Sequence, residues 1–399
     1  MRKEPPPIIQ NEIADGEKGR DSDLLLDNGI EASRSEETFS ELSERYEIPI
    51  EDVRYMDLNR TGIYLPESEV RVNFRARFLA DVPGLDGERR KTWFALPSRT
   101  AKDSNFSVAK NGLFFGNEKI ADVQKVELDT CDVSYQRGPH LLNLNSRSRG
   151  NCAGCKVCVH NYKDLYDGTV IKDKNSLTTK EQIETFFDGK ERNGLDIAKL
   201  EQIAVVTGLF GSERAVIDHL KLIKEIVAPR GFDGELMYFG CEVNSREGLG
   251  EMASLGKTAL VYAIDNFTKR DQILNKRKAA VTPADAKRTL MEAKDMGIET
   301  TFAYIAGIDD LGSLGEGFSD LKESISRFPV VNIYQVQTPG QIAAMHPDAK
   351  KLEYYAKARK LIEGALGDTE LEPRRWENFR PLWYETFGKK QLSTTAHVG

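Results

Sequence analysis

The stretch HLLNLNSRSRGNCAGCKVC, residues 140–158, places a short apolar run directly before three closely spaced cysteines. Residues 140–145 form the apolar run, and Cys152, Cys155 and Cys158 follow with the spacing C-x2-C-x2-C. A short apolar run bounded by polar residues is typical of a buried strand. We therefore expect three thiols in the loop that follows a strand.

After this first strand, strand-like apolar runs alternate with helix-like segments. The six runs expected to be strands are residues 140–145, 201–208, 235–243, 259–265, 299–307 and 330–338. Several are almost continuously apolar, which is typical of parallel strands covered on both faces. The segments between them carry helix start signals, such as Thr282 followed by Pro283. Six strand-helix units predict an α/β fold, a partial (β/α)6 TIM-like barrel, and the alternative is a doubly wound open sheet.

The flanking parts of the chain differ in composition and hydrophobic pattern from this alternating region. Residues 1–35 are polar, with no periodic apolar pattern, and are expected to be a disordered arm. Residues 36–137 are expected to form a β-rich N-terminal extension, because short aromatic and β-branched runs alternate with turn signals. The barrel would then span residues 138–345. Residues 346–399 combine a helical stretch with an aromatic-rich tail, which predicts a lid or a docking segment.

Composition limits the partners and the compartment. The 399 residues carry 63 acidic and 56 basic side chains, with a formal net charge of −7, so no broad positive field favours nucleic acid. The sequence has no apolar run long enough to span a membrane and no apolar signal-peptide core at the start. We expect a cytoplasmic protein with no nucleic-acid or membrane partner. Five cysteines, three of them clustered, favour metal ligation over disulfides.

Three thiolates at this spacing suit either an iron–sulfur cluster or three corners of a zinc tetrahedron. A ferredoxin-type motif would continue with a fourth cysteine, but the sequence reads VHNY after the third. His160 could complete a zinc site, or Cys131 or Cys241 could close a structural metal site. In the remaining alternative, one coordination position stays open for an external ligand.

This last arrangement resembles the radical S-adenosylmethionine (SAM) superfamily, over residues 140 to about 340. In that family, three cysteines after the first strand of a partial barrel hold a [4Fe-4S] cluster, and SAM binds the fourth iron. The resemblance implies reductive cleavage of SAM to a 5'-deoxyadenosyl radical, which removes hydrogen from a substrate. It also implies a one-electron donor such as flavodoxin or ferredoxin. The usual family spacing is C-x3-C-x2-C with an aromatic residue before the last cysteine, whereas here the first gap is one residue shorter and Val157 holds the aromatic position.

Three further segments match family regions that contact the cofactor. The family's Gly-Gly-Glu region is resembled by TGLFGSE (207–213). Its region that contacts the ribose and carboxylate of SAM is resembled by YAIDNFTKRDQI (262–273), and its G-x-I-x-G-x-x-E pattern is resembled by AYIAGIDD (303–310). Taken without the family, they are glycine-rich or polar loop starts, which many α/β proteins have. The resemblance implies a cofactor-binding set of Val157, Thr207, Gly208, Glu213, Asp265, Asn266, Arg270, Ile305 and Gly307.

The remaining cysteines narrow the chemistry. Only Cys131 and Cys241 are left, so we expect a single cluster. Cys241, at the end of the third strand, could return a hydrogen atom to a product radical, although a buried free thiol is the simpler interpretation. Glu242 could contact a polar substrate, but strand alternation lets only one of these two neighbours face the barrel interior. The resemblance leaves rearrangement, epimerisation, elimination, oxidation or cyclisation of a small polar organic substrate, as in natural-product biosynthesis. The opposing hypothesis is a non-enzymatic zinc or iron–sulfur module with a structural or electron-transfer role.

Overall fold

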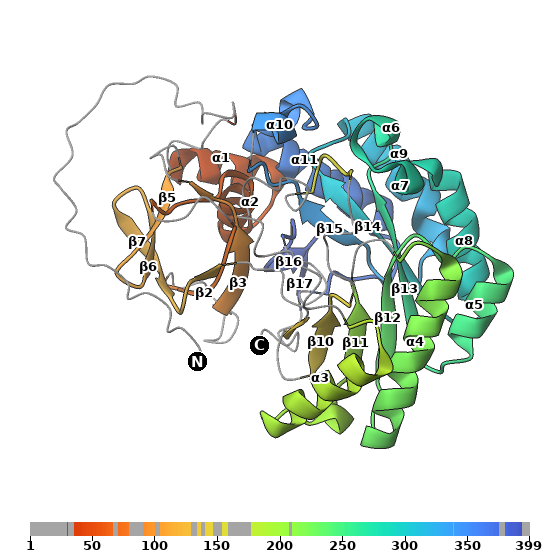
Figure 1. Cartoon of the computed structure of the whole chain (residues 1–399). Coiled ribbons are helices and arrows are strands. Elements are labelled where there is room, and N and C mark those ends of the chain that lie inside the picture. Colours follow the sequence, from red (N-terminus) through yellow and green to blue (C-terminus); the bar gives the residue numbers. More distant parts are fainter. Residues whose placement is uncertain are drawn as a thin grey trace.

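The computed structural model describes residues 30, 36–66, 71–79, 91–99, 104–128, 134–136, 140–146, 154–158, 177–206, 210–337, 339–374 and 380–392. It contains an N-terminal unit built on one sheet and a second unit in which a parallel sheet is covered by helices (Figure 1). The α/β class predicted from the sequence is confirmed. Of the expected N-terminal arm, only Ile30 lies within the described residues, and its side chain is fully buried.

The N-terminal unit combines two helices, α1 (Glu36–Tyr46) and α2 (Ile50–Thr61), with a mostly antiparallel sheet. Its strands are β1 (Ile63–Tyr64), β2 (Val72–Phe78), β3 (Lys91–Leu96), β4 (Ser98–Arg99), β5 (Phe106–Ala109), β6 (Gly112–Phe115), β7 (Glu118–Val123) and β8 (Glu127–Leu128). Alternate residues of β2 are buried, as expected for a sheet with one face against a core. The two helices were not foreseen from the sequence. Nine of the twelve residues of α2 are buried, several of them charged or polar, so α2 lacks the one-sided apolar stripe that reveals a surface helix.

The second unit is built on six parallel strands that lie side by side in chain order. They are β10 (Leu141–Leu144), β11 (Gln202–Val205), β12 (Glu235–Gly240), β13 (Thr258–Asp265), β14 (Glu299–Ala306) and β15 (Val330–Ile333). An additional strand, β9 (Ser134–Gln136), pairs antiparallel with β10. All six predicted strands are present. The alternative of a doubly wound sheet is wrong, because that fold requires the strand order to reverse at a switch point.

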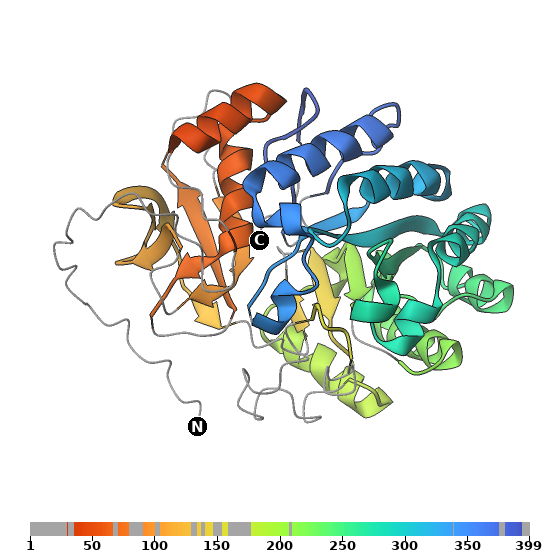
Figure 2. The same ribbon diagram turned by 90° about the horizontal axis from the view of Figure 1, so that it is seen from above.

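Helices connect these strands and follow the outer side of the curved sheet, as the view from above shows (Figure 2). The connecting helices are α3 (Lys180–Arg192), α4 (Glu213–Val227), α5 (Arg246–Ala253), α6 (Arg270–Ile273), α7 (Lys276–Ala280), α8 (Pro283–Asp295) and α9 (Leu311–Leu321). Two more helices, α10 (Pro339–Ile342) and α11 (Leu352–Leu366), follow the last parallel strand. Short 3₁₀ turns cover residues 197–199, 228–230, 322–324 and 347–350. The predicted N-cap of α8 is present, since Thr282 accepts a hydrogen bond from the backbone of Asp285. Among the described helices, none has both the length and the apolar character needed to cross a membrane.

The inner face of the parallel sheet has its own small apolar cluster. Ala204, Met237 and Ala259 are cross-strand neighbours in it, and Val261, Ala303 and Val330 complete it. At the amino ends of the strands this face is closed by a polar group, in which Arg327 pairs with Glu235 at 2.5 Å and Gln202 donates to the same carboxylate at 2.7 Å. Polar groups that could meet a ligand must therefore come from the carboxyl ends.

The C-terminal segment joins the two units. It contains a small hairpin, β16 (Thr386–Phe387) and β17 (Lys390–Gln391). Arg359 on α11 is fully buried, and its guanidinium bonds to Asp52 of α2 at 2.5 Å and to Glu363 at 2.8 Å. The indole of Trp383 donates to Glu363 at 3.0 Å, and Asp52 accepts from the backbone of Tyr384 at 3.0 Å. The described part of the aromatic tail is thus packed against the body of the protein.

Candidate functional site

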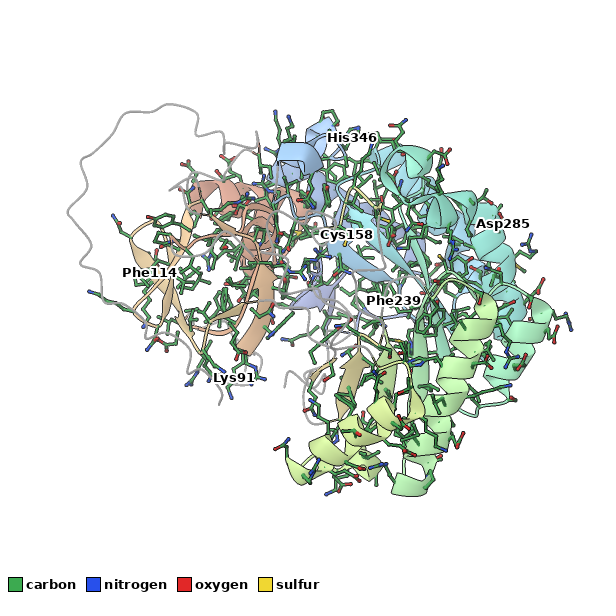
Figure 3. All side chains as sticks on the ribbon, in the orientation of Figure 1. Lys91, Phe114, Cys158, Phe239, Asp285 and His346 are labelled. Carbon is green, nitrogen blue, oxygen red and sulfur yellow. The ribbon has the colours of Figure 1, made fainter. Side chains whose placement is uncertain are left out.

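The cysteine loop, residues 152–158, follows β10 at the carboxyl ends of the parallel strands. Residues 154–158 are described, and Cys152 lies outside the described residues. The backbone N–H of Cys158 donates to the carbonyl of Cys155 at 3.1 Å, which makes this half of the motif a tight turn. Cys155 is buried and Cys158 is half-buried. In Figure 3, Cys158 lies in the interior, between the N-terminal sheet and the outer helices of the second unit.

Two other parts of the chain hold this loop. The backbone N–H of Lys156 donates to the carbonyl of Ile273 at 2.7 Å, just before α7. From beyond β15, at the other edge of the parallel strands, the side chain of Gln341 in α10 donates to the carbonyl of Val157 at 3.3 Å. Gln341 is fully buried, so water does not compete for this bond. The loop is therefore fixed by tertiary contacts, not only by its own turn.

The sulfur of Cys155 accepts two hydrogen bonds from one residue. The backbone N–H and the side-chain amide of Asn275 both lie 3.2 Å from Sγ. Burial raises the pKa of the Cys155 thiol, while the positive charge of Lys278 and the bonds from Asn275 act in the opposite direction. Hydrogen bonds of this kind are typical around thiolates that ligate metal clusters.

A charged pair lies beside this thiol. Asp265 ends β13 at an irregular register with a positive φ of 65°, and its carboxylate pairs with Lys278 of α7. Burial disfavours the ammonium form of Lys278, but the carboxylate of Asp265, together with the sulfurs of Cys155 and Cys241 when these are ionised, outweighs burial and raises its pKa. Lys278 thus interacts electrostatically with groups from three parts of the site, namely the cysteine loop, the end of β12 and the end of β13.

Arg270 and Asn266 stabilise the end of β13. The guanidinium of Arg270 donates to the carbonyls of Ile264 and Asn266, the latter at 2.7 Å, and to the carbonyl of Lys278 at 2.7 Å. Asn266 is fully buried, and its amide nitrogen bonds to the carbonyl of Thr268. Its side-chain oxygen has no hydrogen-bond partner among the described residues. Among the described residues, Asn266 thus keeps a side-chain oxygen that could accept from a ligand, and Arg270 keeps its Nε–H, while the terminal nitrogens of Arg270 are occupied by backbone carbonyls.

Two glutamates exchange hydrogen bonds between neighbouring loops. Glu213, the first residue of α4, accepts from the backbone of Asn244 at 2.7 Å and of Ser245 at 2.8 Å in the loop after β12. In the reverse direction, Glu242 after β12 accepts from the backbone of Phe210 at 2.9 Å in the loop after β11. We call this pair the glutamate clasp. Thr207 and Gly208, predicted in the same β11 loop, lie outside the described residues.

The two predicted catalytic residues differ in their surroundings. The second oxygen of Glu242 accepts from the hydroxyl of Tyr238 at 2.5 Å and from the backbone of Cys241 at 3.0 Å. The Cys241 side chain is buried, and burial raises the pKa of its thiol to about 12, with Lys278 opposing this shift. Cys241 is therefore a neutral thiol at physiological pH, while Glu242 has its hydrogen-bonding capacity used inside the protein.

The end of β14 contains the last predicted cofactor contacts. Ile305 is half-buried and pairs in register with Asn332 of β15. Gly307 has a positive φ of 119°, and a Cβ added there would lie 2.7 Å from the hydroxyl of Tyr355. Packing alone thus requires glycine at this position. Next to it, the fully buried Asp309 accepts from the backbone of Phe267 at 2.8 Å and fixes the loop after β13.

The structure brings together some of the predicted site residues and adds two more. Cys155, Asp265 and Cys241 surround Lys278, which the sequence did not single out, and Asn275 was missed as well. The only sequence signal for Asn275 was that of a helix N-cap before a short basic segment, and such signals are common. Within the described part of the chain, which does not include Cys152, no group of three or more His, Cys, Asp and Glu side chains is placed to hold a metal ion.

The described half of the motif fits an iron–sulfur cluster. Cys155 and Cys158 are free thiols on one tight turn, and Cys155 receives two N–H donors in a buried position. Cluster thiolates carry negative charge in a buried setting, so they require such donors and a nearby cation. Lys278 supplies that cation.

Comparisons with known proteins give only remote similarities. No protein-family model matches the chain, and no curated protein matches it. Among solved structures, it is similar to SuiB of Streptococcus suis bound to S-adenosylmethionine, with 13% identity, a TM-score of 0.38, and coverage of 55% of this chain and 46% of SuiB. It is also similar to the FeFe-hydrogenase maturase HydG from Carboxydothermus hydrogenoformans, with 14% identity, a TM-score of 0.38, and coverage of 59% of this chain and 54% of HydG. The matched region spans about half the length of each of these proteins.

Proposed function

We propose that this chain is a radical SAM enzyme in which Cys152, Cys155 and Cys158 hold one [4Fe-4S] cluster. The observation that carries the proposal is the setting of Cys155, a buried thiol on a C-x2-C turn after the first of six parallel strands, with two N–H donors on its sulfur. When bound, the cluster and SAM would supply the electron transfer and the 5'-deoxyadenosyl radical.

The parallel sheet supports a partial (β/α)6 barrel as the scaffold. Six strands in chain order, with helices on the outer side, have the connectivity of such a barrel. The pair Glu235–Arg327 fills the amino end, and ligands of barrel enzymes bind at the carboxyl end, where the cysteine loop lies. The apolar inner face, with residues such as Met237 and Val261, would keep water from a reactive radical.

The residues around the loop have separable roles in this proposal. Asn275 and Gln341 hold the cysteine loop in place. Lys278, oriented by Asp265, places a positive charge beside the cysteines, and the buried side-chain oxygen of Asn266 offers an acceptor to a polar group of the cofactor. Asp265 and Asn266 lie in the segment 262–273, which the family resemblance assigns to SAM, and Lys278 of α7 is added to them by its ion pair with Asp265.

The other predicted contacts are proposed with the roles that their positions support. Glu213 and Glu242 would shape the mouth through the glutamate clasp, with Glu213 also available to the SAM amino group. Cys241, a neutral thiol near Lys278, suits hydrogen-atom donation to a substrate radical. Val157, Thr207, Gly208, Arg270, Ile305 and Gly307 remain proposed cofactor neighbours. The substrate would be a small polar organic molecule, and a flavodoxin or ferredoxin would supply the electron.

Anaerobic purification tests the proposal directly. The wild-type protein should be brown, contain about four irons per chain, and release 5'-deoxyadenosine from SAM after reduction with dithionite. Cys155→Ala and Cys158→Ala should lose both the iron and the product. The matched control Cys241→Ala removes another buried thiol and should retain the iron. A colourless protein with one zinc per chain would instead establish the non-enzymatic metal-binding alternative.

A further inference from the structure

Asn275 makes an unusual double contact with the sulfur of Cys155. Its backbone nitrogen and its side-chain nitrogen each lie 3.2 Å from Sγ, and the two residues are 120 positions apart in the chain. Both side chains are buried, with Asn275 8% exposed and Cys155 9% exposed. Because water has little access, the sulfur depends on these two donors.

The orientation of the Asn275 amide is fixed by its second role as the N-cap of α7. Its side-chain oxygen accepts from the backbone N–H of Lys278 at 3.0 Å. An oxygen used in this way leaves only the NH2 group to face Cys155. The amide therefore acts as a donor toward the sulfur, and the opposite orientation would remove the cap of α7 and leave the sulfur with only the backbone N–H of Asn275.

The backbone around this contact is matched to it. Lys156 donates to Ile273 at 2.7 Å, which sets the distance between the cysteine loop and the start of α7. Gly154 has a positive φ of 111°, and a Cβ at that position would lie only 3.2 Å from the Cβ of Asn275. The two segments approach as closely as a glycine allows, so the N–H···S contacts are a built feature of the fold.

We propose that Asn275 is a positioning residue that raises the reduction potential of the cluster held by Cys155. This inference rests on the proposed function. Reduction adds one electron to the cluster from a one-electron donor and places more negative charge on its thiolates. Hydrogen bonds to the ligand sulfur stabilise that charge more strongly after reduction than before it, so they favour the reduced state. Asn275 thereby makes the cluster easier to reduce through its contact with a ligand sulfur.

The test compares three variants of the holoprotein by anaerobic redox titration, followed by electron paramagnetic resonance. Asn275→Ser keeps a hydroxyl that can cap α7 but is too short to reach the sulfur, and Asn275→Ala loses both the cap and the donor. The control is Thr282→Ala, which removes the N-cap of the neighbouring helix α8. The hydroxyl of Thr282 bonds to Asp285 and not to a cysteine. We expect the midpoint potential to become more negative in both Asn275 variants. Because each variant loses about one hydrogen bond to the sulfur, the equilibrium constant for reduction should fall about threefold to tenfold. Thr282→Ala should titrate like the wild type.

The outcomes separate this inference from the proposed function. If the wild type holds about four irons and cleaves SAM, but Asn275→Ser titrates at the wild-type potential, Asn275 has no influence on the cluster and the inference is wrong. An equal shift in Thr282→Ala would likewise overturn it, because the effect would then come from helix stability. A wild-type protein without a cluster would contradict the proposed function itself, and the inference with it. Iron content, measured for each variant, shows that the compared proteins carry the same cluster.

Discussion

At the scale of single residues, Gly154 determines whether the cysteine loop can approach α7. We expect Gly154→Ala to destabilise the loop by about 1–3 kcal/mol, because its φ of 111° disfavours a side chain and the added Cβ would crowd Asn275. The iron content after anaerobic reconstitution should fall. Gly194→Ala is the matched control, since Gly194 has a similar φ of 90° but no atom within 4 Å of an added Cβ. It should lower the melting temperature slightly and leave the iron content unchanged, whereas full iron in Gly154→Ala would contradict the prediction.

Residue-scale chemistry was only partly readable from the sequence. The three cysteines stand out by spacing alone, and Asp265 and Asn266, predicted as cofactor contacts, lie at the carboxyl end of the fourth parallel strand, β13, as the sequence pattern indicated. Asn275 and Lys278 were not foreseen. Their proximity to Cys155 depends on how the α6–α7 connection folds back over the sheet, which no local pattern encodes.

At the scale of elements, the glutamate clasp ties the loops after β11 and β12 together. We expect Glu242→Gln to lower the free energy of unfolding by about 1–3 kcal/mol, because an amide has one acceptor oxygen where the carboxylate serves Phe210, Tyr238 and Cys241 with two. Urea unfolding measures the change. Glu247→Gln, an exposed position on α5, should leave the stability as it is. Equal stabilities of the two variants would show that the clasp does not contribute.

Elements were predicted best where burial has a simple period. The six parallel strands are close to continuous apolar runs, and each expected range overlaps the observed strand. Helices α1 and α2 were missed because α2 is buried nearly all round and includes Asp52, Asp57 and Arg60 among its buried residues. Asp57 and Arg60 pair with each other within α2, whereas Asp52 becomes favourable only when Arg359 arrives from elsewhere in the chain.

At the scale of the whole molecule, the N-terminal unit lies against the end of the parallel sheet that carries the cysteine loop. Gln335, just after β15, donates to the carbonyl of Ala95 in β3 at 2.9 Å, and Arg99 donates to the carbonyl of Val336 at 2.7 Å. A few residues later, Gln341 bonds to the cysteine loop. One short segment after β15 therefore contacts both the N-terminal sheet and the candidate site, so changes in that sheet can reach the loop.

The buried cluster of Asp52, Arg359, Glu363 and Trp383 makes the attachment of the C-terminal segment depend on pH. Burial disfavours the charged form of Glu363, but the charge of Arg359 and the bond from Lys360 outweigh it, so the pKa of Glu363 is lowered in the folded protein. A lowered pKa means that the carboxylate stabilises the fold above its unfolded pKa of about 4.3, and that this stabilisation is lost as the pH falls through the folded value.

Glu363→Gln tests this dependence, because it removes the titrating charge while keeping an oxygen that can accept from Trp383. We expect the variant to be less stable than the wild type by about 2 kcal/mol at pH 7, and the difference to shrink as the pH falls through the folded pKa of Glu363 and the wild-type carboxyl becomes protonated as well. Trp383 fluorescence during urea unfolding measures both proteins at each pH. Asp320→Asn, which breaks the exposed pair with Lys287, should cost less than about 1 kcal/mol at any pH. A stability difference for Glu363→Gln that stayed constant from pH 7 down to the lowest pH at which both proteins still fold would mean that shape and packing, and not the charge on Glu363, attach the C-terminal segment to α11.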